Sequence, residues 1–228
     1  MSKQIYLGLQ ALKALHSTIA LFSLLGFSFV ACAATLNAEN PKTLAKTKIL
    51  VYGDSLSAAY GLAQPQGWVV LLQNKLQQQG YHYDVINASI SGETTSGGLT
   101  RLKNTLAKTK PTLIILELGA NDGLRGLPVT EMKANLSAMI SLCKKAKVKV
   151  LLLGMRIPPN YGPKYTETFH QTYLQLSLQH QVALVPFMLE NIAAKPHLIQ
   201  NDSLHPNALG QPLILNNIWP KLIVMLNK

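Results

Sequence analysis

The chain has 228 residues, and 48% of them are hydrophobic, which is enough to bury a core and excludes a disordered or low-complexity protein. Its two cysteines exclude a disulfide scaffold, and one domain is the default at this length. Lys and Arg number 21 against 10 Asp and Glu, and the resulting net charge of +11 favours anionic partners such as phospholipid headgroups.

The N-terminal segment has the pattern of a secretory signal. Lys3 and Lys13 precede an apolar run over residues 19–30, and this run is followed by small residues. We therefore expect residues 1–33 to be a signal peptide that is cleaved after Ala33, so that the protein is exported to the periplasm or secreted.

Two other interpretations of this segment stay open. It could be a retained membrane anchor, although the apolar run is shorter than the roughly 20 residues of a spanning helix. It could also be a lipoprotein signal with Cys32 as the acylated residue. After cleavage, residues 34–47 form an N-terminal extension and residues 48–228 form one domain, which is expected to be a monomer.

Short apolar runs alternate with amphipathic stretches from residue 48 onward. The expected strands are Ile49–Gly53, Asp84–Ala88, Thr112–Leu118, Val148–Met155 and Val182–Phe187. Four of these five runs lack polar alternation, as is typical of parallel strands that are covered on both faces. Apolar stripes at helical spacing separate them, and a last helix is expected from about Ala208 to Leu226, with Pro220 as a kink or break. The pattern predicts a three-layer α/β/α sandwich with a five-stranded parallel sheet, whose ligands bind beyond the carboxyl ends of the strands.

Residues that could support catalysis follow the first three predicted strands. Ser55 lies at a strand-to-helix turn, where a hydroxyl can be presented near free backbone N–H groups, although Asp-Ser at such a place is also an ordinary helix cap. Gly92 offers an unhindered amide, and Asn121 offers a side-chain amide donor. Each also has a structural explanation, a turn glycine for Gly92 and an Asx-turn for Asn121.

A fourth candidate follows the fifth predicted strand. Asp202 and His205 are three residues apart, so the carboxylate can bond Nδ1 and leave Nε2 free to accept a serine proton. As metal ligands the pair lacks a third partner, because the remaining histidines of the domain are scattered, and we expect no metal. Those histidines are His82, His170, His180 and His197, and Cys143 is expected to be a buried helix residue.

Together these segments resemble the four blocks of the GDSL or SGNH hydrolase family, which carry Ser, Gly, Asn and His in that order. Here the blocks are Gly53-Asp54-Ser55-Leu56, Ser91-Gly92-Glu93, Gly119-Ala120-Asn121-Asp122 and Asp202-Ser203-Leu204-His205. Within the family the chain is most similar to the periplasmic bacterial group called thioesterase I, arylesterase, protease I and lysophospholipase. The similarity extends from about residue 48 to the C-terminus, and Glu93, where many relatives carry Asp, is the nearest departure.

The resemblance implies a flavodoxin-like SGNH hydrolase fold and a serine hydrolase that uses no metal or organic cofactor. Ser55 would be the nucleophile, His205 the general base and then acid, and Asp202 the residue that orients the base. The oxyanion would be held by the Ser55 and Gly92 backbone N–H groups and by the Asn121 side chain. Asp54 is expected to support the turn rather than the reaction.

Two loops are expected to form an apolar groove for the acyl chain. Residues 123–128 follow the Asn121 block and resemble the mobile substrate loop of the family, with glycines as hinges and with Leu124 and Leu127 lining the chain. Ile157 and Pro159, after the fourth predicted strand, would form the opposite wall. Either loop could equally be an ordinary structural connector.

The substrates implied are fatty-acyl esters, thioesters and lysophospholipids, with peripheral contact to an anionic membrane surface. One alternative is O-deacetylation of cell-wall or other polysaccharides, which related folds perform. A second is an envelope-binding module without catalysis, although every chemical role is filled. Nucleic acid is not expected as a partner of an exported protein that has no binding motif.

Overall fold

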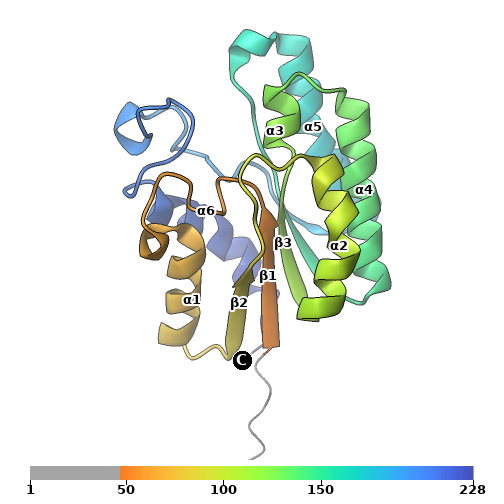
Figure 1. Cartoon of the computed structure of the whole chain (residues 1–228), viewed down its shortest axis with the longest axis vertical. Coiled ribbons are helices and arrows are strands. Elements are labelled where there is room, and N and C mark those ends of the chain that lie inside the picture. The colour runs from red at the N-terminus through yellow and green to blue at the C-terminus, as the bar shows by residue number, and fades with distance from the viewer. Residues whose placement is uncertain (1–46, 228) are drawn as a thin grey trace, which may run out of the picture. The chain divides into compact units, whose positions relative to one another are not determined.

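The structure is a computed structural model that describes residues 47–227, and its centre is a five-stranded parallel sheet (Figure 1). The strands are β1 (Thr47–Gly53), β2 (Tyr83–Asn87), β3 (Leu113–Glu117), β4 (Lys149–Leu153) and β5 (Ala183–Val185). Their order across the sheet is β2-β1-β3-β4-β5. The order reverses between β1 and β3, and ligands of open parallel sheets bind at such a point, beyond the carboxyl ends of the strands.

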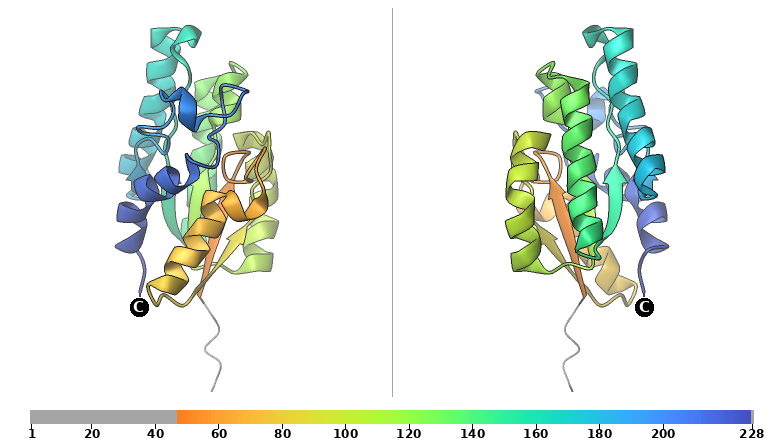
Figure 2. Two further views of the ribbon diagram at one scale, coloured as in Figure 1. Left: turned by 90° about the vertical axis from the view of Figure 1, so that its left-hand side faces the viewer. Right: turned by 90° about the vertical axis from the view of Figure 1, so that its right-hand side faces the viewer.

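Helices cover both faces of the sheet (Figure 2). One layer contains α1 (Trp68–Gln78) and α6 (Gln211–Ile223), and the other contains α2 (Thr95–Thr109), α4 (Val129–Lys145) and α5 (Pro163–His180). The short helices are α3 (Ala120–Leu124) and the 3-10 helices η1 (Gln64–Gln66), η2 (Pro159–Tyr161) and η3 (Pro196–Leu198). This arrangement confirms the predicted three-layer α/β/α sandwich.

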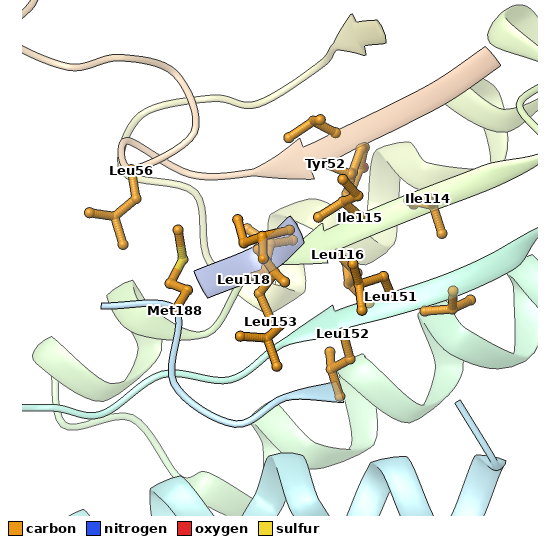
Figure 3. Packing of buried hydrophobic residues seen from close by; sticks show 14 of the residues in the cluster. Tyr52, Leu56, Ile114, Ile115, Leu116, Leu118, Leu151, Leu152, Leu153 and Met188 are labelled. Carbon is orange, nitrogen blue, oxygen red and sulfur yellow. The ribbon is translucent and has the colours of Figure 1, made fainter. Parts of the chain in front are cut away.

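The core lies along β3, which is buried over its whole length. Its apolar side chains pack with those of β4, and Leu56 and Met188 extend the same cluster to the carboxyl edge of the sheet (Figure 3). A strand that is covered on both faces needs apolar residues at consecutive positions. These strands could therefore be predicted from continuous apolar runs, without an alternation of polar and apolar residues. The same packing fixes the ends of β1 and β3, where the candidate residues begin.

The last helix differs from its prediction. It covers Gln211–Ile223 and continues through Pro220, so the expected break is absent. Proline removes the bond to the carbonyl of Asn216, and both of these residues are exposed, so water can satisfy that carbonyl. Ile218 and Leu222 are fully buried on the opposite face and hold the helix against the core on both sides of the proline.

The predictions for the N-terminal segment cannot be compared with the structure, whereas the prediction for Cys143 can. The predicted signal peptide, Cys32 and all but the last residue of the extension lie outside the described residues. Within residues 47–227, no helix is both long enough and apolar enough to cross a membrane. Cys143 lies on α4 and is fully buried, as predicted, and burial raises the pKa of its thiol to about 12.

Candidate active site

The turn after β1 presents Ser55 at the carboxyl edge of the sheet. Asp54 precedes it and is almost completely buried, and its Oδ1 accepts a hydrogen bond from the Leu56 backbone N–H at 3.0 Å. This is an Asx-type turn, in which a carboxylate satisfies a backbone donor that the strand end leaves free. Asp54 therefore supports the turn as predicted, and Ser55 is partly exposed between two anchored residues.

His205 and Asp202 reach Ser55 from the other end of the chain. Ser55 Oγ lies 2.8 Å from His205 Nε2, although the two residues are 150 positions apart. His205 Nδ1 lies 2.6 Å from Asp202 Oδ2. Because Nδ1 faces a carboxylate, it carries the proton, so Nε2 can accept one from the serine hydroxyl. The structure thus brings the three residues together as the resemblance implied.

Asp202 is held by its own turn. Its Oδ1 accepts hydrogen bonds from the backbone N–H groups of Leu204 at 2.9 Å and of His205 at 3.0 Å. Partial burial acts to raise the pKa of Asp202, but these two amides and the His205 ring outweigh it and hold the pKa below the ordinary value. Asp202 is consequently ionised at neutral pH and can orient the imidazole.

Two contacts of the His205 loop were not found from the sequence. The Tyr60 ring packs on the His205 ring with 4.7 Å between centroids. Gln200 Nε2 donates to the backbone carbonyls of Tyr60 at 2.9 Å and of Pro206 at 3.1 Å, and so ties the serine loop to the histidine loop. No local motif marks either residue, because each acts on a segment about 140 positions away.

The three expected oxyanion donors lie around the same cavity. In the described part of the chain, the backbone N–H groups of Ser55 and Gly92 make no hydrogen bond to protein. Gly92 has a φ of +79°, so its turn also favours glycine for a structural reason. Asn121 lies in the first turn of α3, and its Nδ2 donates to Asp54 Oδ2 and to the Glu93 carbonyl, both at 3.1 Å.

A largely apolar cavity of about 600 Å³ opens beside these groups. Three of the four predicted chain-lining residues contribute to its wall, namely Leu124, Ile157 and Pro159. Further apolar lining comes from Met155, Phe187, Leu189, Ile199 and Leu204. This wall is formed from segments after β3, β4 and β5, and the volume suits a small-molecule ligand with an apolar body.

Leu127 is the exception and corrects the expected groove. It does not line the cavity and is 38% exposed, because α3 ends at Leu124 and the chain turns away at Gly126, whose φ is +65°. Gly123, which was expected to act as a hinge, is a buried residue of α3. A Cβ at that position would lie 2.6 Å from Phe169 and 2.7 Å from Ile157.

Tyrosine hydroxyl groups hold the loop after α3. Tyr161 donates to the Leu124 carbonyl at 2.6 Å, and Tyr165 donates to the Leu127 carbonyl at 2.8 Å. Neither tyrosine was found from the sequence as a partner of this loop, because the contacts depend on how η2, which carries Tyr161, and α5, which carries Tyr165, lie beside α3. The bonds fix the backbone that presents Leu124 to the cavity.

A buried acid below the serine turn was also missed. Glu117 ends β3, is fully buried and accepts hydrogen bonds from the Asp54 backbone N–H and the Ser57 hydroxyl. Burial raises the pKa of Asp54 to about 6 and raises that of Glu117 well above its ordinary value. The signal in the sequence is the presence of one acid within an otherwise apolar strand.

Other titratable groups do not assemble into a second centre in the part of the chain that the structure describes. Within residues 47–227, no three His, Cys, Asp or Glu side chains lie together as metal ligands. His170 bonds Arg156 and the Met155 carbonyl, and His180 bonds Ser137. The roles of these two histidines are therefore structural, as predicted.

Comparison with known proteins identifies relatives of the whole described domain. The model of the GDSL-like lipase/acylhydrolase family matches residues 51–213. The esterase TesA of Pseudomonas aeruginosa is 49% identical over 174 residues, which are 76% of this chain and 87% of that protein. The thioesterase 1/protease 1/lysophospholipase L1 of Escherichia coli K12 is 37% identical over 186 residues, or 82% and 88% of the two chains.

A similar solved structure supports the same relationship. The psychrotrophic esterase EstA from a Pseudoalteromonas species, inhibited by monoethylphosphonate, has a TM-score of 0.76 and 46% sequence identity. The alignment covers 80% of this chain and all of that one. A neighbour described as an SGNH-hydrolase esterase, AlinE4, has a TM-score of 0.67 and 39% identity. The structural similarity therefore extends over about four fifths of this chain.

Proposed function

The chain belongs to the GDSL-like lipase/acylhydrolase family, and from that premise we propose that it hydrolyses ester and thioester bonds of fatty-acyl substrates through an acyl-enzyme. The class of enzyme is a carboxylic ester hydrolase, as its relatives are. Its substrates are small-molecule esters. The proposal goes beyond this class in three respects: catalysis by a Ser-His-Asp triad, a fatty-acyl chain in the substrate, and a covalent acyl-enzyme intermediate.

One observation carries this proposal: the hydrogen-bonded series Ser55, His205 and Asp202 borders an apolar cavity. Ser55 Oγ attacks the carbonyl carbon while His205 Nε2 takes its proton. The tetrahedral intermediate collapses, the C–O or C–S bond breaks, and His205 returns the proton to the leaving group. Water then attacks the acyl-enzyme by the same route, which releases the acid and restores Ser55.

The developing oxyanion is held by the N–H groups of Ser55 and Gly92 and by the Asn121 amide. The two backbone donors are free in the described part of the chain, whereas both Asn121 hydrogens already face protein acceptors. The oxyanion therefore competes with the Glu93 carbonyl for one Asn121 hydrogen. Such competition favours the charged intermediate over the neutral ester, because a charged acceptor makes the stronger bond.

The apolar wall supports a fatty-acyl chain as the ligand. Leu124, Ile157 and Pro159 belong to this wall, and each methylene buried against such surface contributes about 0.8 kcal/mol. Lysophospholipids and other acyl esters of the cell envelope fit this chemistry, and the net charge of +9 that residues 34–228 carry suits anionic lipid surfaces. Export is the corresponding proposal for location, and it rests on the sequence pattern of residues 1–33.

The test is the hydrolysis rate of purified protein across p-nitrophenyl esters from acetate to palmitate, with Ser55→Ala as the control. A Ser55-dependent rate that persists to long chains is expected. A rate confined to acetate would replace the lipid proposal with polysaccharide O-deacetylation. Absence of any rate, together with no covalent labelling of Ser55 by an organophosphonate, would leave a binding module without catalysis.

A further inference from the structure

Glu117 occupies an unusual position for an acid. It is the last residue of the central strand β3, pairs in register with Gly53 of β1 and is 0% exposed. Among residues 47–227, no Lys, Arg or His lies within ion-pair distance of it. An ionised carboxyl group that is buried without a cation is strongly unfavourable. The buried position of Glu117 therefore implies that its side chain makes interactions that offset this cost.

Its hydrogen bonds all lead to the turn that carries Ser55. Oε2 accepts from the Asp54 backbone N–H at 3.2 Å and from the Ser57 hydroxyl at 2.8 Å. Oε1 is buried and has no hydrogen-bond partner among the described residues. A Cβ at Gly53 would overlap Oε2, so the glycine before Asp54 leaves the space that this carboxyl group occupies.

Asp54 extends this connection to the oxyanion donors. Its Oδ1 accepts from the Leu56 N–H, and its Oδ2 accepts from Asn121 Nδ2. A displacement of Glu117 would therefore move Asp54, and with it both the Ser55 backbone and the Asn121 amide. Misplacement of reacting groups by about 1 Å can cost on the order of a hundredfold in rate.

The charge of the buried pair Asp54 and Glu117 also affects how easily a negative oxyanion can form beside Ser55. Burial, and next the negative charge of Asp54, raise the pKa of Glu117 well above its ordinary range, and both effects favour the uncharged acid over the carboxylate. The other titratable groups that face the pair are Asp122 on α3, Tyr173 on α5 and His205 on the C-terminal loop. Two of these three can only add negative charge, so an ionised Glu117 would oppose a second negative charge at Ser55.

We propose that Glu117 is a positioning residue for ester hydrolysis. Its carboxyl group is fully buried without a cation in the described part of the chain, which favours its uncharged form; it fixes the serine turn through Asp54 and Ser57 and spares the oxyanion site a further buried negative charge. This inference rests on the proposed function, because the turn it positions is the one that carries the nucleophile. It predicts that an uncharged acceptor is sufficient at this position and that an apolar residue is not.

The experiment compares Glu117→Gln and Glu117→Leu with the wild type on p-nitrophenyl butyrate. The amide oxygen of Gln can accept both hydrogen bonds, so Glu117→Gln should keep kcat within about threefold of wild type. Glu117→Leu should lower kcat by roughly tenfold to a hundredfold, with KM changed less than about twofold, because positioning rather than substrate binding is lost. Glu131→Gln, at an exposed acid on α4, is the matched control.

The pH profile separates positioning from mere structural support. The acid limb of kcat/KM reports protonation of the base in the free enzyme, and a nearby negative charge would move its midpoint. An uncharged Glu117 exerts no such effect, so Glu117→Gln should move that midpoint by less than about 0.2 pH units. A shift above about 0.5 units would show an ionised Glu117 and overturn the proposal.

Further outcomes are equally decisive. Equal losses in Glu117→Gln and Glu117→Leu would mean that a charge is needed, and wild-type kcat in Glu117→Leu would mean that no positioning is needed. If Glu117→Leu does not fold, Ser57→Ala replaces it, with an expected loss of about threefold to tenfold in kcat and none in KM. A wild-type enzyme that hydrolyses no ester would instead overturn the proposed function.

Discussion

The two halves of the candidate site are held in different ways. On the nucleophile side, Asp54 bonds Glu117 and Asn121, which are 63 and 67 positions away, and all the bonds lie within the carboxyl edge of the sheet. On the base side, the three bonds of Asp202 reach no further than three positions, and its side chain is 37% exposed. The proposed nucleophile is thus positioned by tertiary packing, and the proposed base is positioned mainly by a local turn.

Because of this difference, substitutions on the two sides should have different effects on catalytic rate and on the stability of the fold. A substitution on the base side should remove rate without loosening the fold, because few long-range contacts end there. A substitution on the nucleophile side should affect both, because its polar groups are buried and most of their hydrogen-bond partners are distant in the sequence.

The largest expected effect is that of Asp202→Asn. The amide would favour the wrong tautomer of His205, so kcat should fall by about 10⁴ while the melting temperature changes little. Steady-state rates and thermal unfolding check this, with Glu190→Gln, at another exposed acid, as the control. A large loss of stability would contradict the local character of the base side.

Asn121→Ala should lower both the rate and the stability, in contrast to Asp202→Asn. Loss of one oxyanion donor typically lowers kcat by about 10² to 10³. It also removes a hydrogen bond from the buried Asp54 carboxylate, which should lower the free energy of unfolding by about 1–3 kcal/mol without unfolding the protein. Rate and urea unfolding measured on one preparation test both parts, and unchanged turnover would remove Asn121 from the oxyanion site.

A smaller and selective effect is expected at the cavity wall. Leu124→Asp should lower kcat/KM for long acyl chains by about tenfold or more, and for acetate by less than threefold, because only long chains bury surface there. Leu127→Asp is the matched control, since Leu127 lies on the same loop outside the cavity. Equal losses for long and short esters would argue against a chain-lining role for Leu124.

The smallest effect is a pH dependence of opposite sign on the two sides. Burial raises the pKa of Asp54 from 3.8 to about 6, so its contribution to stability is present below about pH 4 and is lost as the pH rises toward 6. The pKa of Asp202 lies below 3.8, so its contribution is present above that value and is lost on acidification, and exposure keeps it small.

Urea unfolding from pH 4 to pH 7 tests this contrast. The stability curve of Asp54→Asn should be flatter between pH 4 and pH 6 than that of the wild type, because the titrating group is gone. Asp202→Asn should leave the shape of the curve in that interval unchanged. Parallel curves for wild type and Asp54→Asn would show that Asp54 keeps its ordinary pKa in the fold.

The same contrast explains what the sequence could predict. The Asp-x-x-His turn could be predicted because its hydrogen bonds are local. The strands could be predicted because each is a continuous apolar run between turn residues. The predicted fifth strand covered residues 182–187, whereas β5 is Ala183–Val185, because the following residues leave the sheet to join the cavity wall. The apolar stripes of the helices can be predicted for the same reason, because their spacing of three and four residues is local.

What could not be predicted depends on register and packing. Glu117 is opposite Gly53 only after β1 and β3 have paired, and Tyr60 reaches His205 only after Gln200 has joined their loops. The assignment of Leu127 to the cavity failed for a similar reason, since nothing in the loop sequence shows where α3 ends. Motifs locate the reacting groups, but tertiary pairing selects their neighbours.

The separation of 150 positions between Ser55 and His205 has a consequence for the order in which the protein is made. A chain emerging from the ribosome has all five strands and its nucleophile by residue 200, but it has no base until its last tenth is added. A polypeptide that ends before His205 should therefore be inactive, because it would carry the proposed nucleophile without the proposed base.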